Sequence, residues 1–168
     1  MRLVLASTSP YRRELLGRLR LPFDVARPDT DETPLAGEAP AALAARLAPG
    51  AWVLGSDQVA ELDGAPLGKS GGREAAIAQL ASMSGRTIAF HTGVCLLRGG
   101  KGGDDAATLW AADVTRVRFR RLDPAEIARY VDAEQPFDCA GSFKSEGLGI
   151  ALFDGIESSD PTALSGCR

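Results

Sequence analysis

The sequence has few of the residues from which proteins build zinc centres and disulfide frameworks. It contains one histidine, His91, and three widely spaced cysteines, Cys95, Cys139 and Cys167, with no Cys-x-x-Cys pair. An odd number of distant cysteines argues against a disulfide framework and against a structural zinc site. A histidine-rich catalytic zinc site is excluded as well. Any metal would therefore bind to carboxylates and substrate phosphates, which are ligands that suit magnesium or manganese.

The sequence also lacks a long apolar run and a large excess of charge. The apolar run that starts at Leu3 is short and leads directly into a Ser/Pro segment, so it is neither a secretory signal core nor a membrane span. We therefore expect a cytoplasmic protein. A net charge of −3 leaves no broad basic surface for polymeric nucleic acid. The 168 residues are enough for one substantial core, and we expect a single domain over 1–168.

Short apolar runs that alternate with helical patterns predict an α/β fold. The predicted strands are 3–6, 23–26, 52–54, 87–97 and 108–119, and the predicted helices are 10–19, 40–48, 73–83 and 124–134. Asp63 and Gly64 are typical of a hairpin turn. Residues 137–149 are too rich in glycine for a helix and too polar for a core strand, so we expect a functional loop there.

The segment RLVLASTSPYRRELL, from Arg2, predicts a strand that runs directly into a helix N-terminus. Ser9 suits the N-cap and Pro10 the first helical position, so Arg12 and Arg13 fall in the first turn. Hydroxyl groups, free backbone N–H groups and guanidinium groups then converge, together with Ser7, on a volume that suits an anion such as phosphate. The alternative, a capped surface helix with solvated arginines, stays open on the residues alone.

Acidic residues form a second candidate constellation. Asp31 and Glu32 lie in a Pro/Asp-rich loop, and Asp57 follows the strand 52–54, so we expect Asp57 at the carboxyl end of a strand, where open α/β sheets place ligands. Such carboxylates could hold a divalent ion, and one of them could take a proton from water. A solvated acidic turn is the alternative. Lys69 follows a glycine and could project towards a phosphate. The alternative is a lysine on the surface with no ligand.

Together these segments resemble the Maf-like nucleoside triphosphate pyrophosphatases, and most closely their 7-methyl-GTP branch. The matching segments are LASTSPYRRELL from Leu5, DET from Asp31, GSDQV from Gly55, LGK from Leu67 and AGSFKSEGLGI from Ala140. They occur in the family's order along almost the whole chain. The resemblance implies a mixed, twisted α/β sheet flanked by helices with a substrate cleft. It also implies hydrolysis between the α and β phosphates of a nucleotide, aided by a divalent cation.

The resemblance also assigns roles to individual residues. Asp57 becomes the proton acceptor, and Glu32 and Asp57 become the ligands of a magnesium or manganese ion. The phosphate-binding residues are Ser7, Ser9, Arg12, Arg13 and Lys69. Base choice is tied to three further positions, which here are Tyr11, Gln58 and Glu146.

The three specificity positions place the chain with the methylated guanine branch. A 7-methylguanine ring carries positive charge, so the face of Tyr11 and the carboxylate of Glu146 suit it. The sibling branch, which prefers dTTP and UTP, has threonine and glutamine where this chain has Gln58 and Glu146. Two alternatives remain: the same chemistry on dTTP or UTP, and a nucleotide-binding regulatory protein with little or no turnover.

Two departures from the family motivate the second alternative. The family usually continues the helix after Ala48 through a phosphate-facing lysine, whereas this chain has Pro49 and Gly50 there. The chain also stops at Arg168, where relatives continue into a final amphipathic helix. Loss of that helix would uncover apolar surface, so we expect either lower solubility or a homodimer.

Overall fold

The computed structural model describes residues 2–7, 10–25, 51–98, 107–160 and 162–164. These residues divide into two compact units. The first is formed by residues 1–57 and 93–112, and the second by residues 58–92 and 113–168. Within the described ranges, no helix is long and apolar enough to cross a membrane.

The first unit begins with a strand–helix–strand segment. β1 (Leu3–Leu5) is followed by α1 (Pro10–Arg18) and then by β2 (Asp24–Val25). β1 lies parallel both to β2 and to the start of β3 (Trp52–Leu62). Successive side chains of a strand point to opposite faces of the sheet. The apolar run of β1 therefore feeds two small cores, one in which Val4 packs with Val53 and one in which Leu5 packs with Leu16 of α1.

A tight hairpin connects β3 to β4 (Ala65–Leu67). Leu62 pairs with Ala65 across the turn, and the two turn residues have positive φ angles, 53° at Asp63 and 80° at Gly64. Two positive angles define a type I′ turn, which Asp-Gly adopts readily. The hairpin predicted from the sequence is confirmed.

Two helices cover the core of the second unit. α3 (Arg73–Met83) and α4 (Pro124–Glu134) have the predicted bounds. The Asp123 side chain accepts a hydrogen bond from the Ala125 N–H and so caps α4. Arg73 donates two hydrogen bonds, of 2.6 and 2.9 Å, to the carboxylate of Asp132, which ties α3 to α4 and lowers the pKa of Asp132.

The main core of this unit centres on aromatic rings. Phe143 is 4% exposed and makes edge-to-face contacts with Phe90, Phe119 and Phe153 at centroid separations of 5.3, 5.5 and 6.1 Å. Such contacts add to the stabilisation from apolar burial. Phe143 belongs to the loop that precedes the 3₁₀ helix η1 (Leu148–Leu152), so the glycine-rich segment is anchored in the core.

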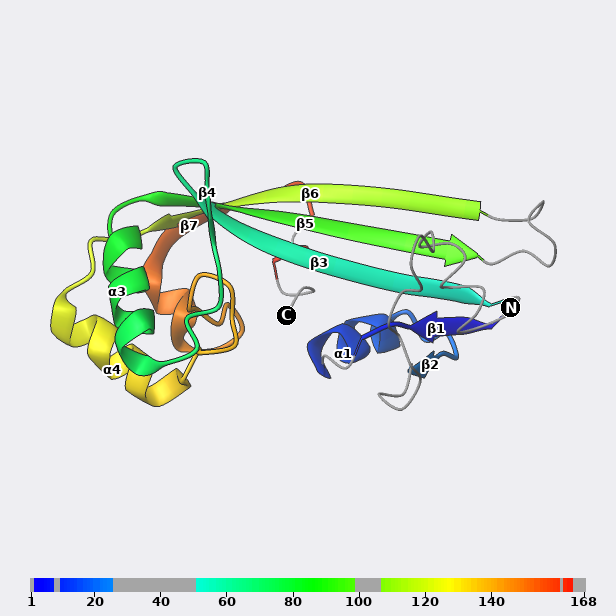
Figure 1. Ribbon diagram of the computed structural model, residues 1–168, viewed down its shortest axis with the longest axis horizontal. Coiled ribbons are helices and arrows are strands. Elements are labelled where there is room, and N and C mark those ends of the chain that lie inside the picture. The colour runs from blue at the N-terminus through cyan, green and yellow to red at the C-terminus, as the bar shows by residue number, and fades with distance from the viewer. Residues whose placement is uncertain (1, 8–9, 26–50, 99–106, 161, 165–168) are drawn as a thin grey trace, which may run out of the picture. The chain divides into compact units, whose positions relative to one another are not determined.

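The sheet has the strand order β2-β1-β3-β5-β6-β7, and β4 pairs with β3 (Figure 1). β5 (Thr87–Arg98) and β6 (Ala107–Phe119) follow the predicted β segments, whereas β7 (Phe153–Glu157) is an addition to them. The mixed α/β fold expected from the sequence is confirmed. The predicted helix 40–48 lies outside the described residues.

Candidate active site

The junction between β1 and α1 brings two of the predicted phosphate-binding residues together. Arg12 Nη1 donates a hydrogen bond of 3.1 Å to Ser7 Oγ. Arg12 is half-buried and Arg13 is exposed, and the first turn of α1 contains no acidic residue. A helix N-terminus that carries cations in place of acids favours a bound anion. Tyr11 lies in the same turn, whereas Ser9 lies outside the described residues.

The prediction that Asp57 ends a strand is wrong. β3 continues from Trp52 to Leu62, so Asp57 lies in its interior, with an exposed side chain. The segment Gly55–Asp57 has low β-propensity, and for this reason its sequence suggests that the strand ends there. Pairing overrides this preference because β3 lies between two other strands, β1 and β5. Asp57 and Gln58 are consecutive on this strand, so their side chains point to opposite faces.

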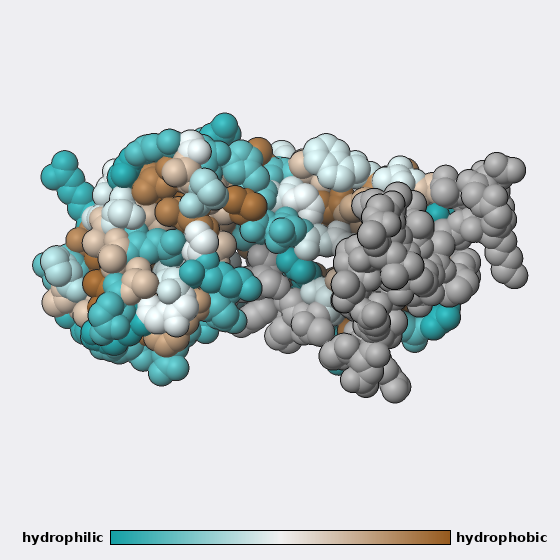
Figure 2. Space-filling model, viewed as in Figure 1, coloured by the Kyte–Doolittle hydropathy of each residue, from teal (hydrophilic) through white to brown (hydrophobic). Residues whose placement is uncertain are grey.

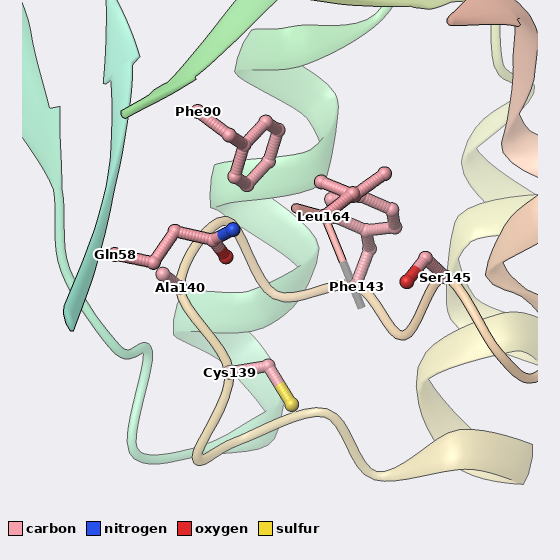
Figure 3. A pocket seen from close by; sticks show the side chains of 7 residues that line it. All are labelled: Gln58, Phe90, Cys139, Ala140, Phe143, Ser145 and Leu164. Carbon is pink, nitrogen blue, oxygen red and sulfur yellow. The ribbon is translucent and has the colours of Figure 1, made fainter. Parts of the chain in front are cut away.

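Gln58 lines a hollow in the second unit, together with residues of the glycine-rich segment (Figure 3). The other lining residues are Phe90, Cys139, Ala140, Phe143, Ser145 and Leu164. The hollow is small, with a volume of about 10 Å³, and it is partly open to solvent. Most of the lining side chains are apolar, but the surface that they leave open towards the hollow is more polar than apolar. Gln58 and the segment around Ala140, which are far apart in the sequence, thus form one pocket.

The backbone of Lys69 lies beside a residue of the pocket wall, Ala140. It forms an isolated antiparallel bridge with Ala140, and its side chain is exposed. Backbone pairing therefore places the Leu67–Lys69 segment beside the start of the predicted functional loop.

The loop that carries Glu146 is held against the end of α4. The Lys144 N–H donates to the Tyr130 hydroxyl oxygen at 2.8 Å, and Lys144 Nζ donates to the Glu134 carbonyl oxygen at 2.7 Å. The Leu148 N–H donates to Glu134 Oε1 at 2.9 Å. A Cβ at Gly149 would lie 2.2 Å from the Lys144 carbonyl oxygen, so this turn requires glycine. Glu146 itself is exposed and directly follows Ser145 of the pocket wall.

The described residues contain no group of three or more His, Cys, Asp or Glu side chains that could hold a metal ion alone. Glu32, the other predicted metal ligand, lies outside them. His91 takes no part in the pocket wall: it is exposed on β5 and shares a 2.8 Å hydrogen bond with Glu61.

Sequence reasoning missed the apolar wall of the pocket and one polar residue behind it. Thr92 is 4% exposed and accepts a hydrogen bond of 2.9 Å from Gln58 Nε2. A signal for it exists in the sequence, because Ile88, Phe90 and Thr92 occupy alternate positions of a predicted strand. A threonine in register with buried apolar residues indicates an inward-facing hydroxyl that needs a partner.

Comparisons with known proteins find relatives that match nearly the whole chain. The family model described as Maf-like protein matches residues 2–167. A protein of Xanthomonas oryzae pv. oryzae named 7-methyl-GTP pyrophosphatase is 59% identical, over 98% of this chain and 90% of its own. Proteins with the same name from a Polaromonas species and from Cupriavidus metallidurans are 55% and 53% identical, again over 98% of this chain, and over 78% and 86% of their own.

Proposed function

This chain belongs to the Maf-like protein family, and from that membership we propose that it is a nucleoside triphosphate pyrophosphatase acting on 7-methyl-GTP. The products are 7-methyl-GMP and diphosphate, so the enzyme removes a modified nucleotide from the pool. The observation that carries the proposal is the near full-length similarity to relatives of that name, which includes Asp57, Gln58 and the loop of Glu146 within the matched region.

The triphosphate is bound by the N-terminal segment. Arg12, whose guanidinium group is already oriented towards Ser7, and Arg13 supply positive charge at the N-terminus of α1. Charge-assisted hydrogen bonds to phosphate are about twice as strong as neutral ones. Ser9 and Lys69 complete the proposed phosphate-binding set. These groups bind the phosphates and orient the bond that is broken.

Asp57 serves as the proton acceptor. It takes a proton from the attacking water, the bond between the α and β phosphates breaks, and diphosphate leaves. An exposed carboxylate on a paired, rigid strand is well placed for this role, since the strand fixes its backbone while the oxygens stay accessible.

A divalent cation, magnesium or manganese, supplies charge neutralisation on the phosphate oxygens when bound. Asp57 and Glu32 are the proposed ligands. This donor set fits magnesium, which commonly binds one or two carboxylates together with substrate phosphates.

The base is read by Tyr11, Gln58 and Glu146. A carboxylate accepts hydrogen bonds from the N–H edge of guanine, and an aromatic face attracts the positively charged methylated ring. Gln58 presents its amide at the pocket wall.

The test is release of diphosphate from 7-methyl-GTP in the presence of magnesium or manganese, with the wild type compared with Asp57→Ala. We expect release by the wild type and a loss of at least about a hundredfold in the variant, the usual contribution of a general base. Equal release by both proteins would remove Asp57 from the mechanism. Absence of release by either, with nucleotide still protecting against unfolding, would favour the regulatory binding protein.

Substrate choice needs a second comparison. The double change Gln58→Thr with Glu146→Gln should move the preference from 7-methyl-GTP towards dTTP and UTP. An unchanged ratio of kcat/KM values would mean that other residues select the base.

A further inference from the structure

Thr92 is one of the buried polar residues of the second unit. It is 4% exposed on β5, two residues beyond Phe90, which is 1% exposed and lines the pocket. Its hydroxyl accepts from Gln58 Nε2 at 2.9 Å and donates to the Ala163 carbonyl oxygen at 3.2 Å. Gln58 Nε2 also donates to the same carbonyl oxygen, at 3.3 Å.

The protons in this network dictate how the Gln58 amide is turned. A carbonyl oxygen can only accept, so the bond between Thr92 and Ala163 uses the single hydroxyl proton of Thr92. The Thr92 oxygen can then only accept from Gln58. Both neighbours are therefore satisfied by N–H groups of Gln58. A flipped amide would set its oxygen against the Ala163 carbonyl oxygen, and Thr92 could donate to it only by giving up its own bond to Ala163.

The carbonyl end of the Gln58 amide consequently faces away from Thr92 and Ala163. In Figure 3 the amide nitrogen lies on the side of Leu164, the neighbour of Ala163, and the oxygen lies on the side of Cys139. An amide oxygen has two lone pairs, so it can accept from a ligand in addition to any bond that it takes from the protein.

We propose that Thr92 is a positioning residue for base recognition: it fixes the Gln58 amide so that Oε1, an acceptor, is the group offered to the base. This inference rests on the proposed function. A guanine-type base carries N–H donors on its edge, including the exocyclic amino group, and an acceptor matches them. With the amide turned over, the NH₂ group would meet those donors and repel them.

The test uses two substitutions that separate the hydroxyl group from the shape of the side chain. Thr92→Val removes the hydroxyl and keeps the shape, whereas Thr92→Ser keeps the hydroxyl. We expect Thr92→Val to raise KM for 7-methyl-GTP about fivefold to tenfold, the effect of one lost hydrogen bond, with a much smaller change in kcat. Thr92→Ser should stay close to the wild type. Thermal unfolding of each variant checks that the chain is folded.

A double-mutant cycle separates positioning from a general structural effect. In a Gln58→Ala background the amide is gone, so Thr92→Val should cause no further rise in KM. A rise of the same size in both backgrounds would overturn the proposal, and so would a Thr92→Val enzyme with wild-type KM.

Binding of 7-methyl-GTP to the same variants, measured by calorimetry, distinguishes this failure from failure of the proposed function. If the wild type binds without turnover, the proposed function fails, and a fivefold to tenfold weaker Kd for Thr92→Val still supports the role of Thr92. If the wild type neither binds nor hydrolyses the nucleotide, both are overturned.

Discussion

In the first unit, the side chain of Arg12 is charged and is already held in place by the protein. Its guanidinium group is half-buried and hydrogen-bonded to Ser7, which limits its rotamers before any ligand arrives. Ordering a long side chain on binding costs free energy, and a side chain that is already held loses less. The contact with Ser7 therefore argues against a merely solvated arginine at Arg12.

Arg12→Lys tests this distinction. Lysine keeps the positive charge but cannot present two parallel N–H groups to a phosphate. We expect KM for the nucleotide to rise about tenfold, as for the loss of one charge-assisted hydrogen bond. Arg18→Lys is the matched control, because Arg18 lies on the same helix and forms an exposed ion pair of 2.9 Å with Glu14. If the two variants have the same KM, Arg12 is not a phosphate ligand.

Strands and helices carry most of what the sequence could predict. The bounds of α3 and α4 follow from local signals: Asp123 and Pro124 begin α4, and apolar spacing defines its buried face. The turn at Asp63 and Gly64 is equally local. The course of β3 does not follow from local signals, because its continuation through Gly55–Asp57 depends on its neighbours in the sheet.

The candidate site follows the same division. The contact between Ser7 and Arg12 joins residues five apart and was predictable as a convergence at one helix end. The contact of Gln58 with Thr92 joins residues 34 apart, and that of Gln58 with Ala163 joins residues 105 apart. Only the folded sheet and the returning C-terminal segment bring these groups together, so the sequence pattern could not reveal them.

The connection between β6 and the segment after β7 depends on one carboxylate. Asp113 of β6 accepts hydrogen bonds from Ser159, Ser158 and Thr115, and these bonds lower its pKa, with Ser159 the largest cause. A carboxylate whose pKa is lowered by folding stabilises the native state above its unfolded pKa. That contribution is lost as the pH falls through the lower, folded pKa.

Asp113→Asn should therefore have its largest effect near neutral pH. We expect the variant to be less stable than the wild type at pH 7, and the difference in free energy of unfolding to shrink as the pH falls below about 4, where an ordinary aspartate becomes protonated. Urea unfolding at several pH values measures this. Asp154→Asn on β7 removes the same formal charge and serves as the control. A difference that does not change with pH would show that the ionised form of Asp113 is not what holds the segment.

At the scale of the whole molecule, the described residues form two compact units that share three strands, β3, β5 and β6. The single domain and the homodimer expected from the sequence both stay predictions. Apolar residues reach the surface among hydrophilic ones, as the brown and teal areas of Figure 2 show, and the exposed apolar side chains of the second unit include Leu148, Ile150 and Ile156. Scattered exposure of this kind is normal for a folded protein.

Ligand binding should stabilise the whole chain only when metal and nucleotide are present together. The proposed protein ligands are Asp57 and Glu32, and magnesium held by one or two carboxylates commonly takes further ligands from the substrate phosphates. Asp57→Asn suits this experiment because it keeps an oxygen ligand but cannot accept the proton, which prevents turnover. With magnesium and 7-methyl-GTP at a hundred times its Kd, the free energy of unfolding should rise by about 2.7 kcal/mol. Magnesium alone, or nucleotide with a chelator, should raise the free energy of unfolding much less, as measured by thermal denaturation. An equal rise with magnesium alone would mean that the protein holds a preformed metal site, contrary to the role that we assign to the substrate phosphates.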